Sequence, residues 1–233
     1  MGRSTLTRGA PLPMDEERVV GVGEGLLVHE VERTRGRGPS TRRARSERGS
    51  VLVEAAFITP VLFFLLFSVL EFGMAFRDYL AVANTTRDGA RAASVFGNDT
   101  TADFDILQTV ADASNVIDRR DLERIVVYKA SGPNTPVPPA CVNAPQGIPG
   151  TCNVYGAGAL DLAETEFGCR GDRNLDRFWC PQTRKTALAG ANGPPDYVGV
   201  WVRVNHPWVT GLFGRSLTFT DTTVMRMEPE SSR

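Results

Sequence analysis

Residues 48–54 read RGSVLVE, and the uncharged segment AAFITPVLFFLLFSVL follows at residues 55–70. A helix running from Val51 to Phe76 is long enough to cross a bilayer, because about 20 residues at about 1.5 Å each span the hydrocarbon core. Pro60 lies inside this run and predicts a local kink, since proline removes a backbone hydrogen bond. Glu54 lies near the start of the helix, where a carboxylate is costly without a partner. The stretch therefore predicts a membrane helix whose first carboxylate needs a counter-ion.

Arginines are concentrated directly before this segment. Residues 33–48 contain a single acid, Glu47, and seven arginines: Arg33, Arg35, Arg37, Arg42, Arg43, Arg45 and Arg48. A basic tract can bind nucleic acid, but one that adjoins a membrane span favours the positive-inside rule. We therefore expect a single-pass protein of the cytoplasmic membrane, with its N-terminus inside, its C-terminal domain outside and no nucleic-acid partner.

The composition divides the chain into three parts. Residues 1–49 are rich in Gly, Pro, Ser and Arg and are expected to form a disordered cytoplasmic leader. Residues 50–76 are expected to form the transmembrane helix, and residues 77–233 an extracytoplasmic domain. A secretory signal has a shorter apolar core followed by a cleavage site between small residues, so this segment is expected to stay in the membrane.

The pattern beyond the membrane predicts an α+β domain. The helix is expected to continue to Gly97-Asn98, and a second amphipathic helix is expected at residues 102–116. Alternating segments predict strands at residues 124–130, 197–204 and 216–227. These strands are expected to form an antiparallel sheet of three to four strands, packed on the outer half of the long helix. The face of the second strand that is expected to be buried consists of Val198, Val200, Val202 and Val204.

Four cysteines lie after the span, in two pairs with the same spacing of 11 residues: Cys141, Cys152, Cys169 and Cys180. An even count on the exported side suggests disulfides, although four cysteines allow three connectivities. Pairing of neighbours is favoured, because it would staple the loop-rich excursion at residues 131–195. A zinc site is the alternative, but it requires tighter spacing between the cysteines, so no metal is expected.

Motifs for catalysis are missing from the sequence. The chain contains two histidines, His29 and His206, and it has no Gly-x-Ser-x-Gly or phosphate-binding loop. Residues 172–176 (DRNLD) match the first half of a calcium loop, but Arg177 replaces the turn glycine and Thr183 replaces the bidentate acid. We therefore expect no catalytic residue, no cofactor and no enzyme activity.

Three segments together resemble the TadE-like family, the minor pilins or pseudopilins of the tight-adherence pilus system. They are RGSVLVEAAFITPVLFFLLFSVLEFGMAF at residues 48–76, DYLAVANTTRDGARAAS at residues 78–94 and TTVMRMEP at residues 222–229. The resemblance implies that a prepilin peptidase cleaves after Gly49 and leaves Ser50 as the new N-terminus. Ser50 departs from the phenylalanine that classical type IV pilins carry there. The implied partners are the membrane, this peptidase, other pilin-like subunits and the pilus assembly machinery.

The resemblance also gives Glu54 a role, since it becomes the fifth residue of the mature chain. Its carboxylate could neutralise a new α-amino group in the membrane, its own or that of a neighbouring subunit. The alternative is an interfacial acid that reaches the lipid headgroups. Glu71, near the other end of the span, is expected to reach the outer interface or to pair with Arg77. The small residues Gly89, Ala90 and Ala93 would allow close approach of another element, either within the domain or from a partner.

The sequence thus favours a structural function. The expected protein is a minor pilin-like subunit that helps to assemble a tight-adherence type IV pilus by helix–helix packing after cleavage, in the cytoplasmic membrane or, once assembled, at the cell surface. The alternative is an uncleaved, membrane-anchored extracytoplasmic binding module.

Overall fold

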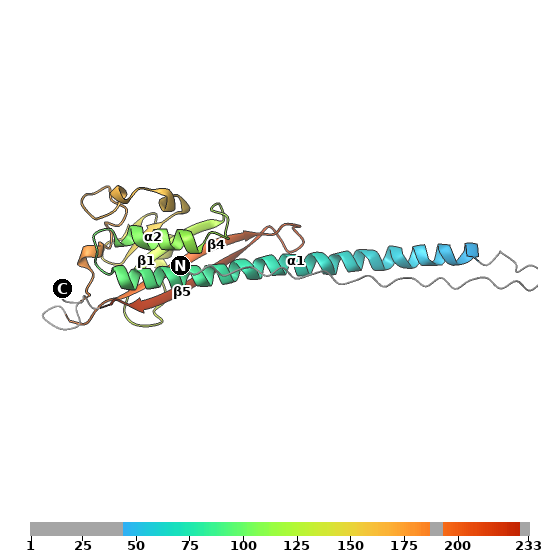
Figure 1. Ribbon diagram of the computed structural model, residues 1–233, viewed down its shortest axis with the longest axis horizontal. Coiled ribbons are helices and arrows are strands. Elements are labelled where there is room, and N and C mark those ends of the chain that lie inside the picture. The colour runs from blue at the N-terminus through green and yellow to red at the C-terminus, as the bar shows by residue number, and fades with distance from the viewer. Residues whose placement is uncertain (1–43, 187–192, 229–233) are drawn as a thin grey trace, which may run out of the picture. The chain divides into compact units, whose positions relative to one another are not determined.

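The computed structural model describes residues 44–186 and 193–228 (Figure 1). The chain separates into two units, Met1–Ser50 and Val51–Arg233. Most of the expected leader, residues 1–49, lies outside the described residues.

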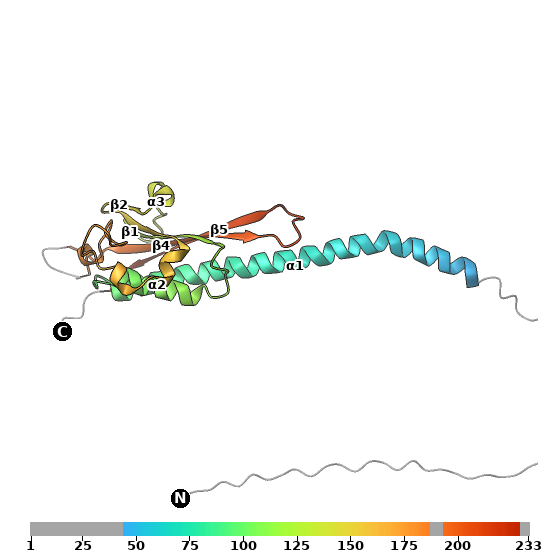
Figure 2. The same ribbon diagram turned by 90° about the horizontal axis from the view of Figure 1, so that it is seen from above.

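The first element is the helix α1, Ala44–Phe96, which contains Pro60. Figure 2 shows that α1 bends in its N-terminal part, in keeping with the predicted kink. The helix ends where Gly97 adopts the left-handed conformation with φ of 55°, which a residue without a β-carbon reaches at no steric cost. The Gly97 amide donates to the Ala93 carbonyl at 3.3 Å, so the predicted C-terminal glycine cap is confirmed.

A second helix, α2 (Ala102–Ala113), follows after a short turn and buries Ile106, Leu107 and Val110. It ends three residues before the predicted boundary. The reason is local, because Ser114 donates to the Ala111 carbonyl through its hydroxyl and the Ile117 amide donates to the Ser114 carbonyl, which forms a turn.

The sheet has five antiparallel strands in the order β2-β3-β1-β4-β5. The strands are β1 (Leu122–Ala130), β2 (Gly147–Ile148), β3 (Cys152–Tyr155), β4 (Tyr197–Pro207) and β5 (Ser216–Arg226). The three predicted strands are confirmed as β1, β4 and β5. The expected count of three to four strands is too low, because β2 and β3 lie in the cysteine-rich excursion and are too short to show alternation. That excursion also contains α3 (Pro139–Asn143) and the short 3-10 helices η1 (Ala157–Asp161), η2 (Glu164–Glu166) and η3 (Pro181–Thr183).

Both faces of the sheet are covered. The helices α1 and α2 cover one face, and α3 with its loop lies on the other (Figure 2). The predicted valines of β4 are fully buried on the helical side: Val198, Val200, Val202 and Val204. On the opposite side, Trp201 of β4 packs in a smaller core with Tyr128 and the Cys141–Cys152 pair. The α+β architecture is therefore as expected, with a long apolar helix followed by a small antiparallel sheet domain.

Candidate functional site

The N-terminal half of α1 exposes its apolar side chains. Between Val51 and Leu70 every side chain is exposed except Ser68, which is half-buried. In the described part of the chain, Gly49–Phe96 is the one helical stretch that is long and apolar enough to cross a membrane. The helix leaves the sheet and continues without neighbours from its own domain (Figure 1). An apolar surface of this size requires a cover, either lipid or another protein.

The three residues that carry the cleavage hypothesis lie in this half of α1. Gly49, Ser50 and Glu54 are all helical and exposed. Among the residues that the structure describes, no cation or amide contacts the Glu54 side chain. Its carboxylate is thus available to a group outside the described part of the chain.

The C-terminal half of α1 is packed on its own domain. Ala90 and Ala93 are fully buried, and Gly89 lies between α2 and β4. A β-carbon on Gly89 would lie 2.9 Å from Val110 Cγ2 and 3.3 Å from Val200 Cγ1. The small residues that could have docked a partner are therefore occupied by intramolecular packing.

Buried polar contacts fix this half of α1 to the β4–β5 hairpin. Asp78 accepts a hydrogen bond from His206 Nδ1 of β4 at 2.7 Å, and both side chains are buried. Ser94 Oγ donates to the Arg226 carbonyl of β5 at 2.8 Å, and Thr86 Oγ1 donates to Asp221 of β5. Sequence reasoning missed these pairs because more than a hundred residues separate the partners.

Glu71 is buried and accepts two backbone hydrogen bonds from the loop between β4 and β5. The donors are the amides of Val209, at 3.1 Å, and Thr210. The expected ion pair with Arg77 is not formed, because Arg77 binds Asp78 at 2.9 Å instead. Glu71 therefore ties the tip of the hairpin to α1.

The cysteines are bonded as neighbours, Cys141 to Cys152 and Cys169 to Cys180. The first bond joins α3 to β3, and the second closes the loop that leads to η3. Both lie in the excursion between β1 and β4, where the sequence favoured them.

A fully buried ion pair holds the same excursion against α2. Arg184 Nη2 lies 2.6 Å from Asp103 Oδ1. The other oxygen of Asp103 accepts from Tyr155 Oη at 2.5 Å and from Asn153 Nδ2 at 2.8 Å. Burial, and after it the charge of Asp103, raises the pKa of Tyr155 well above its usual range. Three residues thus contact the buried carboxylate of Asp103: Arg184, Tyr155 and Asn153. These contacts indicate a structural clamp.

The calcium-like pattern at residues 172–176 contributes a carboxylate that binds backbone amides. The Asp176 carboxylate accepts hydrogen bonds from the amides of Gly168 at 2.8 Å and Cys169 at 3.1 Å. Burial raises the pKa of Asp176. Within the described ranges, no three His, Cys, Asp or Glu side chains come together as metal ligands would.

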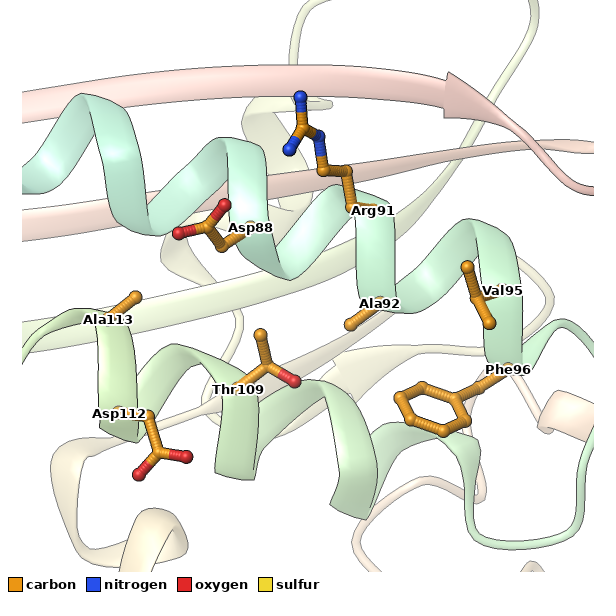
Figure 3. A pocket seen from close by; sticks show the side chains of 8 residues that line it. All are labelled: Asp88, Arg91, Ala92, Val95, Phe96, Thr109, Asp112 and Ala113. Atoms are coloured by element: carbon orange, nitrogen blue, oxygen red, sulfur yellow. The ribbon is translucent and has the colours of Figure 1, made fainter. Parts of the chain in front are cut away.

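A groove of about 550 Å³ runs between α1 and α2. Figure 3 shows its lining, in which Val95 and Phe96 lie at one end and Arg91 extends away from α2. Its polar groups do not converge on one point, which a catalytic pocket requires.

The fold and the exposed half of α1 fit the class of single-pass membrane proteins, because within the described residues one long apolar helix is followed by a folded α+β domain. Residues 49–91 match the family model described as TadE-like protein. The match covers the apolar half of α1 and most of its packed half, and it confirms the resemblance expected from the sequence. Comparison with curated proteins and with solved structures gives no significant match.

Proposed function

We propose that this protein is a minor pilin-like subunit for the assembly of a tight-adherence type IV pilus. The observation that carries the proposal is the exposed apolar half of α1, which lies within the TadE-like match at residues 49–91. The TadE-like family is structural rather than enzymatic, and its role is associated with the pilus. The protein acts by packing its N-terminal helix against other pilin-like subunits and the assembly machinery.

The helix enters this packing after a cut by a prepilin peptidase between Gly49 and Ser50. The arginines before the cut hold the N-terminal side in the cytoplasm, so that the sheet domain lies outside. Cleavage removes the basic leader and places a new α-amino group at the start of an apolar helix. The positive charges of the leader, which oppose export, are lost. The new α-amino group of Ser50 carries a positive charge that can pair with a carboxylate.

Glu54 supplies the partner for this amine. In the described part of the chain its carboxylate is exposed and has no donor, and a lone carboxylate in a bilayer is costly. Pairing with the amine of Ser50, in its own chain or in a neighbouring subunit, turns two isolated charges into an ion pair. In an assembly, this pair would set the axial register between helices.

Mass spectrometry of the protein from native membranes tests the cleavage step. We expect a mature N-terminus at Ser50. Replacing the residue before the cut with a bulky one, Gly49→Leu, should leave the full-length chain in the membrane, because the side chain obstructs the bond that the peptidase attacks. As a matched control, Gly73→Leu places the same side chain at an exposed glycine of α1 with open space around it, and cleavage should continue. An intact leader in the wild-type protein would overturn the proposal.

The second candidate is an uncleaved, membrane-anchored binding module. The groove between α1 and α2 favours it, because such a surface could bind a ligand outside the membrane. This function requires the anchor but neither the cut nor a role for Glu54. The same mass spectrometry distinguishes the two candidates.

A further inference from the structure

The loop between β4 and β5 forms an apolar tip beside α1. Residues 208–215 read WVTGLFGR, and Gly211 and Gly214 turn the chain with φ of 71° and 111°. Val209 is 73% exposed, Leu212 50% and Phe213 38%. A loop in water normally exposes polar side chains, so this tip is unusually apolar for a solvated turn.

The tip lies level with the end of the apolar run in α1. The ring of Phe72 is 5.8 Å from the ring of Trp208 and 4.9 Å from that of Phe213, measured between centroids. Twenty residues from Val51 to Leu70 rise about 30 Å, which is the thickness of the hydrocarbon core. A span that begins at Val51 therefore ends next to Glu71 and Phe72, where the tip is attached.

Glu71 provides hydrogen-bond acceptors for backbone amides of the tip, which lies beside the end of the apolar run. Backbone amides near the hydrocarbon core are costly unless they have acceptors, because water is scarce there. The Glu71 carboxylate accepts from the amides of Val209 and Thr210, at the point where the hairpin ladder ends. The tip can therefore meet lipid with apolar side chains outward and these two amides satisfied.

The surface beside the tip is also apolar. A groove of about 650 Å³ lies between α1 and the start of β5, and its lining is apolar and aromatic: Phe72, Gly73, Ala75, Phe76, Tyr79, Leu217 and Phe219. Two exposed arginines adjoin this surface in the sequence, Arg77 in α1 and Arg215 in the tip. Long cationic side chains at such positions reach the phosphate headgroups. Tryptophan and tyrosine are enriched at membrane interfaces, since their rings are apolar and carry one polar group, and Tyr79 and Trp208 are such residues here.

We propose that the β4–β5 tip inserts into the outer lipid interface and forms a second membrane contact beside α1. The occupant of this apolar surface is phospholipid, at the boundary between headgroups and acyl chains. The contact would fix the tilt and rotation of the sheet domain relative to the bilayer. It requires α1 to cross the membrane, but it depends neither on cleavage nor on pilus assembly.

Trp208 provides the probe, since the other two tryptophans, Trp179 and Trp201, are buried in the domain. The full-length chain is reconstituted in phosphatidylcholine–phosphatidylglycerol vesicles with acyl chains brominated at shallow or deep positions. The Trp208 signal is the difference between wild type and Trp208→Phe. We expect shallow bromines to remove most of this signal, deep bromines to remove less, and aqueous iodide to remove little.

Two variants sharpen the test. Leu212→Asn combined with Val209→Asn replaces the apolar side chains with neutral polar ones, which do not repel the iodide anion. This variant should make Trp208 accessible to iodide and insensitive to bromine, while α1 keeps the protein in the vesicles. Val95→Asn introduces one side chain of the same kind at an exposed valine near the far end of α1, and it should leave the quenching unchanged. Far-ultraviolet circular dichroism and the emission of the two buried tryptophans verify that both variants are folded.

Each remaining outcome contradicts the proposal. A wild-type Trp208 signal that iodide quenches and bromine does not would place the tip in water. A signal that neither reagent quenches would place another protein chain over the tip. Failure of the wild-type protein to float with the vesicles would instead contradict the membrane span itself, independently of cleavage.

Discussion

At the scale of single residues, Gly199 shows how this sheet uses a missing side chain. Gly199 of β4 lies directly opposite Tyr128 of β1, and the tyrosine ring covers it. A β-carbon on Gly199 would lie 2.2 Å from Tyr128 Cζ. The ring is also fixed at its outer end, because Tyr128 Oη donates to the Thr135 carbonyl at 2.6 Å. Glycine is therefore required here for close packing rather than for backbone flexibility.

We predict that Gly199→Ala lowers the free energy of unfolding by about 1–3 kcal/mol, the usual effect of overpacking a core. The ring would have to move and release Thr135. Gly156→Ala is the matched control, because a β-carbon there meets no atom within 4 Å and the backbone φ is −90°. Urea unfolding of both variants in detergent micelles measures the difference. Equal stability of the two variants would contradict this account of the Tyr128 contact.

Tyr128 also makes stability depend on alkaline pH. Burial raises its pKa from 10.0 to about 12, so the folded protein keeps the phenolic proton at a pH where the unfolded chain has lost it. The free energy of unfolding therefore decreases as pH rises from about 10 to about 12. Tyr128→Phe should weaken this decrease over the same range, although Tyr155 contributes as well. Unfolding curves collected between pH 9 and 12 on both proteins test the prediction; identical pH slopes would contradict it.

At the scale of elements, the sequence predicts the strands whose residues alternate between apolar and polar. It does not predict contacts between residues that are far apart in the chain. The strands β1, β4 and β5 are long enough for alternation to show, and Gly97 indicates the end of α1 by its conformational freedom. The two-residue β2 and four-residue β3 have no such pattern. The clamp of Asp103 on Arg184 joins residues 81 positions apart, and nothing local in the sequence indicates that an acid of α2 is buried.

The clamp yields a prediction at this scale. Asp103→Ala should lower the free energy of unfolding by about 3–5 kcal/mol, because it leaves the Arg184 guanidinium buried without a counter-ion. The double variant Asp103→Ala, Arg184→Met removes both charges and should recover a large part of this loss. Denaturant unfolding of the two variants measures the difference.

The exposed pair of Asp118 and Arg120 is the control for the clamp. Asp118→Ala should not change the unfolding midpoint, since water screens charges at the surface. If the double variant were less stable than Asp103→Ala alone, the contribution of Arg184 would come from its packing over the Trp179 ring, at 4.3 Å, rather than from its charge.

At the scale of the whole molecule, one helix serves two environments. Its C-terminal half is packed on the sheet domain through Gly89, Asp78 and Ser94, and its N-terminal half exposes apolar side chains from Val51 onward. The sequence could predict this division from composition alone, since the apolar run and the arginines mark it. It could not predict that Glu71 would bind the hairpin tip, because that partner is 138 residues away. Glu71 is therefore bound within the domain, whereas Glu54 has no partner among the described residues.

Glu54 gives the last prediction, which concerns assembly rather than folding. Glu54→Gln keeps the size of the side chain and removes the charge that would neutralise the amine of Ser50. We expect the variant to retain the domain stability of the wild type, because Glu54 is exposed and contacts no described side chain. We expect it to lose chemical cross-linking to pilin-like partner subunits in native membranes, since the amine would stay unpaired in lipid.

The control places the same substitution in the sheet domain. Glu166→Gln changes an exposed carboxylate of η2 and should leave cross-linking unchanged. Determining the N-terminus of each variant separates the two ways in which assembly can fail. A chain with Glu54→Gln that begins at Ser50 and no longer cross-links has lost the packing step alone. The same mature chain with wild-type cross-linking would show that the carboxylate has no part in assembly, and the interfacial role of Glu54 would then be the better explanation.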